Sequence, residues 1–261
     1  MHEGHGIVSV AQIDDVSGGG EGDGGAMAID SREQPTRVGR RRIVLADVVS
    51  NGPRAEVDVA LVLAVDSSGS ISQDRLLMQM RGYTSALRHP SFIEAVRGGN
   101  HGRIGLTYVT WTDARRQEQV VGWRVIGDSA GAEAFAHSIE TAILPGPGWT
   151  SISGAIDFCT GLLMGNGYVA TRRVIDVSGD GANNDGRPVT EARDAAVAAG
   201  VTINGLPIVE VEPDLEKYYR ENVIGGSDAF VVVARDTASF GQAVLRKLLV
   251  EVAGLRAPIR G

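Results

Sequence analysis

Cysteine, basic charge and long apolar runs are all scarce in this sequence, and each scarcity excludes a class of protein. Cys159 is the only cysteine, which excludes an internal disulfide and a cysteine-based zinc site. Its apolar surroundings, IDFCTGLLM, predict a buried helix residue rather than a nucleophile. The net charge of −7 argues against a nucleic-acid-binding protein, which normally has a basic face. No run approaches the roughly 18 apolar residues of a membrane span, so we predict none.

The chain divides by composition into a folded part, a long N-terminal flank and a short tail. The early stretch VSGGGEGDGGAMAIDSREQPTR is rich in glycine and charge and cannot bury enough surface to become ordered. The run IVLADVVSNG is too short and carries Asp47, so it is no convincing signal peptide. We therefore predict a disordered segment over residues 1–55, one folded domain over 56–255 and a short tail over 256–261.

Strand-like runs alternate with helical patterns from Val57 onward. We predict strands at 57–65, 103–112, 119–126, 172–180, 201–209 and 229–234. We predict helices at 72–89, 129–144, 151–164, 189–200, 214–222 and 237–254. The run at 119–126 follows its predecessor too closely for a helical crossover, so it should form an antiparallel edge strand. The pattern predicts an α/β fold of Rossmann-like type: a doubly wound, mostly parallel six-stranded sheet with helices on both faces.

Five oxygen-bearing side chains lie where predicted strands end or helices begin: Asp66, Ser68, Ser70, Thr150 and Asp180. Ligands of doubly wound sheets bind outside the carboxyl ends of the strands, so these side chains can converge on one edge. Three hydroxyls and two carboxylates suit a hard cation such as Mg²⁺, which prefers six oxygens and usually retains waters. Mn²⁺ and Ca²⁺ are alternatives, of which a small, hydroxyl-rich site favours Mn²⁺.

Each of these residues also has an ordinary explanation. Aspartate and serine after a strand often cap the next helix, as does a threonine in the position of Thr150. Asp180 followed by Gly181 is a common turn pair. The explanations are independent of one another, so the whole set is much harder to obtain by accident than any member. We therefore favour the metal site.

The motifs DSSGS, TSISGAI and SGDG resemble the metal-ion-dependent adhesion site (MIDAS) of von Willebrand factor type A (vWA) domains. The longer phrases HGRIGLTYVTW and RRVIDVSGDGANNDG are similar to the bacterial family of uncharacterised proteins called DUF1194. The resemblance implies that Ser68, Ser70 and Thr150 touch the metal, and that Asp66 and Asp180 act mostly through water. Relatives typically carry an export signal, which implies a periplasmic or secreted location.

Three functions follow as hypotheses. The leading one is a binding module whose Mg²⁺ accepts a carboxylate from a partner protein, without turnover. The second is an accessory subunit of an AAA+ ATPase; the chain has no phosphate-binding loop, so the ATPase must be another polypeptide. The third, a metal-dependent hydrolase, needs a base beside the metal, and no histidine lies near the motif residues in sequence.

Other polar and aromatic residues adjoin the motifs. Asn183, Asn184 and Asp185 follow Asp180 closely and either shape the site or form a simple turn, which we slightly favour. Trp111 and Trp149 either line the edge of the site, where an aromatic ring can anchor a partner, or pack in the core.

Overall fold

The structure is a computed structural model that describes residues 54–69, 73–142, 148–236 and 239–254. Of the segments predicted to flank the domain, 1–55 and 256–261, all but residues 54 and 55 lie outside the described residues, and so does Ser70. Five strands form one sheet in the order β3-β2-β1-β4-β5. They are β1 (Glu56–Asp66), β2 (Ile104–Trp111), β3 (Gln117–Ile126), β4 (Val169–Gly179) and β5 (Thr202–Pro207).

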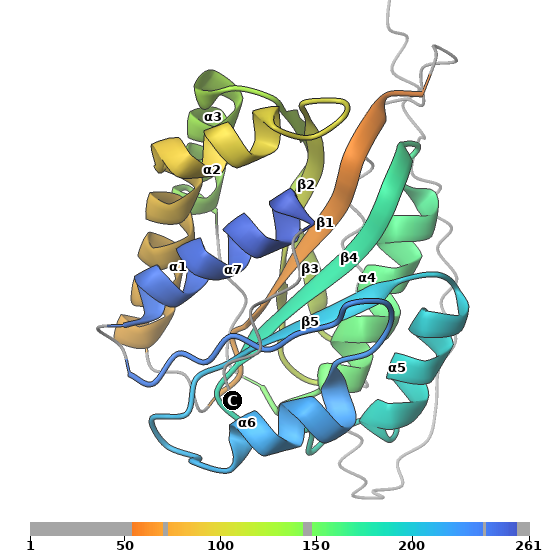
Figure 1. Ribbon diagram of the computed structural model, residues 1–261. Coiled ribbons are helices and arrows are strands. Elements are labelled where there is room, and N and C mark those ends of the chain that lie inside the picture. Colours follow the sequence, from red (N-terminus) through yellow and green to blue (C-terminus); the bar gives the residue numbers. More distant parts are fainter. Residues whose placement is uncertain (1–53, 70–72, 143–147, 237–238, 255–261) are drawn as a thin grey trace, which may run out of the picture. The chain divides into compact units, whose positions relative to one another are not determined.

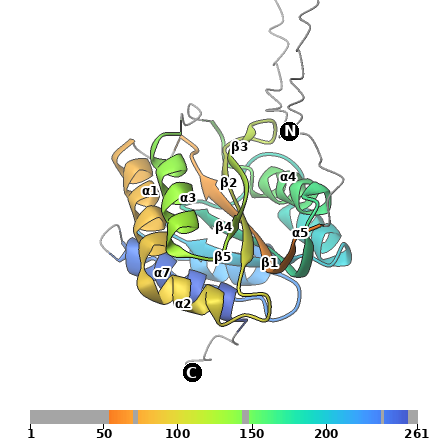
Figure 2. The same ribbon diagram turned by 90° about the horizontal axis from the view of Figure 1, so that it is seen from above.

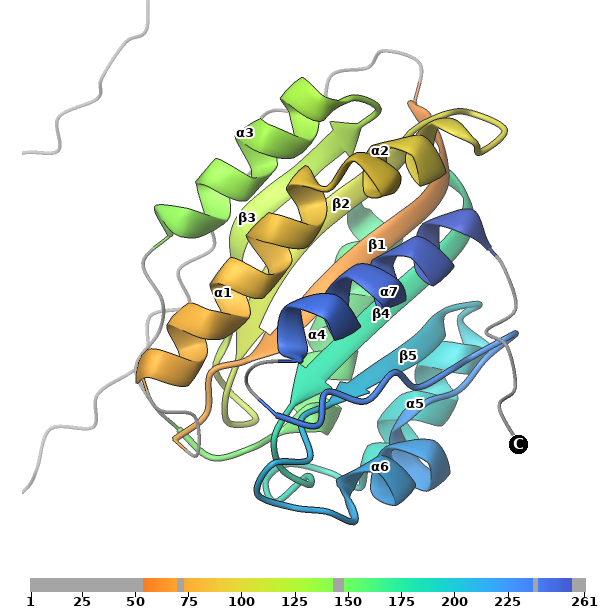
Figure 3. The ribbon, with the colours of Figure 1, turned by 60° about the vertical axis from the view of Figure 1, so that its left-hand side comes forward.

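Helices cover both faces of the sheet (Figures 1 and 2). One face carries α1 (Gln73–Arg88), α2 (Pro90–Arg97), α3 (Ser129–Glu140) and α7 (Phe240–Ala253), which come forward in Figure 3. The other face carries α4 (Ile152–Gly165), α5 (Val189–Ala198), α6 (Leu215–Tyr218) and the π-helix η1 (Tyr219–Val223). Among the described residues, no helix is long and apolar enough to cross a membrane.

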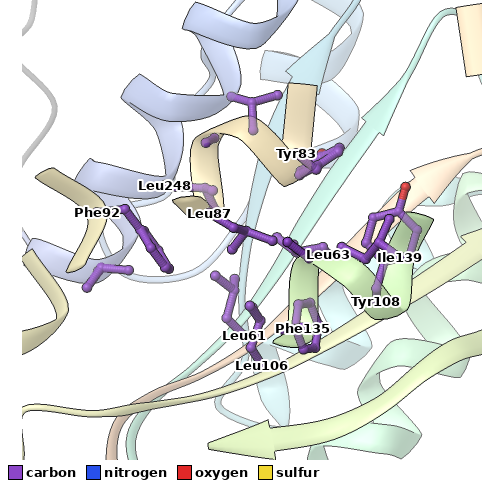
Figure 4. Close-up of a cluster of buried hydrophobic side chains, with 14 of the residues drawn as sticks. Leu61, Leu63, Tyr83, Leu87, Phe92, Leu106, Tyr108, Phe135, Ile139 and Leu248 are labelled. Atoms are coloured by element: carbon purple, nitrogen blue, oxygen red, sulfur yellow. The ribbon is translucent and has the colours of Figure 1, made fainter. Parts of the chain in front are cut away.

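β1 lies at the centre of the sheet because its side chains are apolar on both faces. Leu61 and Leu63 contribute to the core beneath α1, α2, α3 and α7, where Figure 4 shows them among side chains of those helices. Val62 and Ala64 contribute to the opposite core beneath α4 and α5. Successive residues of a strand face opposite sides, so a run with apolar residues at every position requires cover on both sides.

The prediction of a mostly parallel α/β sheet with one antiparallel edge strand is confirmed. β1 pairs in parallel with β2 and β4, β4 pairs in parallel with β5, and β3 pairs antiparallel with β2. β1 and β4 are adjacent although β2 and β3 separate them in sequence, and α1 and α4 lie on opposite faces. The carboxyl ends of β1 and β4 therefore form the switch point at which ligands of such sheets bind.

The prediction of a sixth strand at 229–234 is wrong. The segment runs beside β5 and makes two isolated parallel bridges, Gly205 with Val231 and Ile208 with Ala234. Between these bridges lies Pro207, which has no N–H to donate and interrupts the ladder. The apolar run FVVVA nevertheless covers the edge of β5, which explains why its pattern resembles that of a strand.

α7 is fixed to the sheet by a buried charged cluster. Lys247 Nζ lies 2.8 Å from Asp176 Oδ1 and 2.7 Å from Glu251 Oε1, and all three side chains are buried. Asn204 Nδ2 donates to both carboxylate oxygens of Glu251 at 2.9–3.0 Å. Burial alone lowers the pKa of Lys247, but the two adjacent carboxylates raise it above its ordinary value. Lys247 is therefore a buried cation held between two anions.

Candidate metal centre

Four of the five side chains singled out in the sequence lie in the described residues, and they come from three elements at the switch point. Asp66 is the last residue of β1, and Ser68 follows it by two positions. Thr150 directly precedes Ser151, the N-cap of α4, and Asp180 directly follows β4. All four are at least 95% buried, with exposed fractions between 0 and 5%.

Hydrogen bonds fix the loop after β1. The backbone N–H of Ser68 donates to Asp66 Oδ1 at 2.7 Å, which orients the carboxylate. Thr150 Oγ1 donates to Ser68 Oγ at 3.3 Å, so the two hydroxyls meet. The backbone N–H of Gly69 donates to the carbonyl of Gly148 at 2.8 Å, which ties the loop after β1 to the loop before α4. The two loops therefore present their hydroxyls as one unit.

The charged form of the Asp66 carboxylate is unfavourable in the absence of a cation. Its pKa is raised to about 7, mainly by burial and to a smaller degree by the nearby charge of Asp180, against the opposing effect of hydrogen-bond donors of Ser68 and of the Asp180 backbone. Asp66 Oδ2 is buried, and no group in the described part of the chain hydrogen-bonds to it. A buried carboxylate oxygen is normally satisfied by a hydrogen-bond donor, an ordered water or an ion.

Arg75, in the first turn of α1, is a residue of the site that the sequence reasoning missed. Its Nη1 lies 3.5 Å from Asp180 Oδ2, and its Nη2 lies 3.1 Å from Glu210 Oε2. The guanidinium thus offsets part of the negative charge at the edge of the site. The sequence signal for it is its position soon after the DSSGS motif, in the first turn of the helix that follows.

The polar loop after Asp180, which contains Asn183 and Asn184, holds the backbone around Thr150 in place. It does more than form the simple turn that the sequence slightly favoured. Asn184 Oδ1 accepts from the backbone N–H of Thr150 at 3.0 Å, and the backbone N–H of Asn184 donates to the carbonyl of Thr150 at 2.9 Å. Asn183 Oδ1 accepts from the backbone N–H of Ser153 at 2.9 Å. The loop thus fixes the backbone that carries the Thr150 hydroxyl.

The two tryptophans near the motifs have different environments. Trp111 is fully buried at the end of β2, which supports core packing for this residue. Trp149 is 71% exposed, although its chain neighbours Gly148 and Thr150 are held by the bonds described above. Trp149 is therefore the aromatic side chain that the metal-site loop exposes to solvent.

Cys159 is buried in α4, as its sequence context predicts.

The donor set that converges here consists of oxygens. Within the described ranges no three histidine, cysteine, aspartate or glutamate side chains form a cluster of metal-ligand type. Two carboxylates and at least two hydroxyls remain, and these are ligands of hard cations such as Mg²⁺ rather than of soft ones. The residues present therefore fit an oxygen-liganded divalent cation.

Comparison with known proteins places the chain in a family and a fold. The model of the family described as "Protein of unknown function (DUF1194)" matches residues 56–256. No curated protein matches the chain in sequence.

Several solved structures share the fold. Proximal thread matrix protein 1 from the mussel byssus, in a structure with a zinc-occupied MIDAS motif, is 14% identical and has a TM-score of 0.56; the match covers 77% of this chain and 49% of that one. The chain thus spans about half the length of that relative. The vWF domain of the pilus tip protein Mfa5 from Porphyromonas gingivalis is 10% identical with a TM-score of 0.54, and the match covers 80% and 99% of the two chains. A vWA protein from Catenulispora acidiphila is 18% identical with a TM-score of 0.51, and the match covers 77% and 43%. These likenesses show the vWA fold.

Proposed function

The chain belongs to the DUF1194 family of proteins of unknown function, and we propose that it is a metal-dependent protein-binding module. One observation carries the proposal: Asp66, fully buried, has an oxygen without a hydrogen-bond partner in the described residues, beside a second carboxylate and two hydroxyls. A divalent cation at this place relieves the charge of both carboxylates. The zinc-occupied motif of the byssus protein supports a cation in this fold.

The proposed ligands are the hydroxyls of Ser68, Ser70 and Thr150, with Asp66 and Asp180 acting mostly through water. Mg²⁺ is the first candidate ion because the donors are hard oxygens, and Mn²⁺ or Ca²⁺ are the alternatives. When bound, the ion supplies an electrophilic position for a carboxylate of a partner protein. The residues of this chain bind and orient the ion, and the proposal includes no chemical turnover.

The exposure of Trp149 supports the proposal that the partner is a protein. An aromatic side chain that is 71% exposed beside a polar site provides a large apolar contact, and tryptophan is among the residues most enriched in the energetic centres of interfaces. We assign Trp149 to the contact with the partner, next to the carboxylate that binds the ion. Adhesion and pilus proteins among the structural neighbours support the same kind of recognition.

The experiment has two steps, both with the full chain. Calorimetric titration with MgCl₂ measures ion binding, and Ser68→Ala should abolish it. Ser138→Ala is the matched control, because this serine lies on α3 and its hydroxyl donates to Ala134 O within the helix. Wild-type protein that binds no Mg²⁺, Mn²⁺ or Ca²⁺ would refute the metal site.

Immobilised chain should then capture a protein from the organism that encodes it with Mg²⁺ but not with EDTA. Ser68→Ala should lose this capture, and Trp149→Ser should lose it while still binding Mg²⁺. Capture that persists in EDTA and in Ser68→Ala would contradict a metal-dependent module, even if the metal binds.

A further inference from the structure

Tyr219 belongs to the π-helix η1, and its side chain runs from β5 toward the metal centre. Two glycines on adjacent strands make room for it. A Cβ on Gly205 would lie 2.7 Å from the ring carbon Cδ1 of Tyr219, and a Cβ on Gly179 would lie 3.0 Å from its hydroxyl oxygen. The ring therefore lies against β5 at Gly205, and the hydroxyl reaches the end of β4. π-Helical turns of this kind occur frequently at functional sites.

The hydroxyl of Tyr219 reaches the same place as the carboxylate of Asp66. The Cβ that Gly179 lacks would lie 2.9 Å from Asp66 Oδ2, so both oxygens border this one position. Both side chains are fully buried, and neither Tyr219 Oη nor Asp66 Oδ2 hydrogen-bonds to any residue in the described ranges. Two buried polar atoms without partners that lie this close together, on the same side of Gly179, are costly unless something satisfies them both.

The chemistry of the two groups is complementary. Burial raises the pKa of Tyr219 well above its ordinary value, and the charges of Asp66 and Asp180 raise it further, so the hydroxyl remains a donor. Asp66 Oδ2 is an acceptor with two lone pairs, so it can serve the metal centre and still accept a second hydrogen bond. Buried waters typically bridge such groups, with two to four hydrogen bonds each.

We propose that Tyr219 is a positioning residue of the metal centre, and that one buried water molecule links its hydroxyl to Asp66 Oδ2 beside Gly179. The link fixes the second oxygen of the carboxylate, as the Ser68 backbone fixes the first. The effect on ion binding rests on the proposed metal site, whereas the bridging water does not.

Calorimetric titration of the full chain with MgCl₂ tests the positioning role. Tyr219→Phe should weaken Mg²⁺ binding about tenfold, the loss typical when a group that orients a ligand is removed. Tyr108→Phe is the matched control, because Tyr108 is also fully buried and its hydroxyl also has no partner among the described residues, but it lies in the opposite core. It should change Mg²⁺ affinity by less than about twofold. Equal affinities of the two variants would overturn the proposal.

A crystal structure of the metal-free wild-type chain tests the water directly. We expect an ordered water within hydrogen-bonding distance of both Tyr219 Oη and Asp66 Oδ2, and its absence would overturn the proposal. This result decides the matter if Tyr219→Phe fails to fold. It also separates the two proposals: a chain that binds no cation but holds the water refutes the metal centre and retains the link.

Discussion

Thr150 Oγ1 donates a hydrogen bond to Ser68 Oγ over 3.3 Å, although 82 positions separate the two residues. The contact joins the start of α4 to the loop after β1. It exists because α4 lies on the face of the sheet opposite α1, so that both loops end at the same switch point. Hydroxyls that meet in this way, next to two buried carboxylates, are suited to share a small cation.

Thr150→Val tests this pair of hydroxyls with little change in shape. The variant should lose most Mg²⁺ binding, because it removes one proposed ligand from the ion. Thr160→Val is the control, because Thr160 lies on α4, the helix that follows Thr150, and its hydroxyl donates to Ile156 O in the preceding turn. Titration calorimetry should show wild-type affinity for Thr160→Val. Similar affinities of the two variants would argue against Thr150 as a ligand.

Asp66→Asn should stabilise the metal-free protein at neutral and higher pH. Burial raises the pKa of Asp66 to about 7, so the folded state retains a proton that the unfolded state releases near pH 4. The free energy of unfolding therefore falls as pH rises from about 4 to 7, by roughly 4 kcal/mol at about 1.4 kcal/mol per pKa unit. Asparagine removes this loss.

The measurement is urea unfolding in EDTA at several pH values. The stability advantage of Asp66→Asn over wild type should grow between about pH 4 and pH 7 and then level off. Asp194→Asn, which removes a carboxylate that is 68% exposed on α5, is the control for the loss of a surface charge. An advantage of Asp66→Asn that is the same at every pH would mean that the carboxylate is not strained by burial.

Sequence patterns predict the parts of this protein that local chemistry determines. The double-sided apolar run of β1, the antiparallel β3 and the motif positions of Asp66, Ser68 and Thr150 all follow from residue type and spacing. The prediction of a sixth strand at 229–234 was wrong because Pro207, on the neighbouring strand β5, interrupts the ladder of hydrogen bonds. The apolar pattern of residues 229–234 does not reveal which residues they would have to pair with. Tyr219 was missed for a similar reason, because only the folded chain places Gly205 beneath its ring and Gly179 beside its hydroxyl.

Asn184→Ala should weaken Mg²⁺ binding without abolishing it. Asn184 Oδ1 accepts from the Thr150 backbone, so its loss loosens the loop that positions a proposed ligand but removes no ligand. We expect a loss of about tenfold, as for other groups that orient ligands. Asn222→Ala is the control, because Asn222 lies in η1 and its side chain donates to Tyr218 O at the end of α6. Wild-type affinity in Asn184→Ala would show that Thr150 needs no such support.

Lys247→Met should destabilise the fold strongly, because it leaves Asp176 and Glu251 as two buried carboxylates without their cation. We expect a loss of about 3–5 kcal/mol in the free energy of unfolding, measured by urea denaturation. Lys217→Met, at an exposed pair with Glu221, should cost less than about 1 kcal/mol.

Replacing the whole charged cluster separates the cost of burial from the role of the helix. The triple variant Lys247→Met, Asp176→Val and Glu251→Met should recover most of the stability, since it leaves no buried charge without a partner. Asn204 Nδ2 then loses its acceptors on Glu251, which should keep the recovery incomplete. A triple variant as unstable as Lys247→Met alone would mean that the charges themselves, rather than their mutual compensation, hold α7 on the sheet.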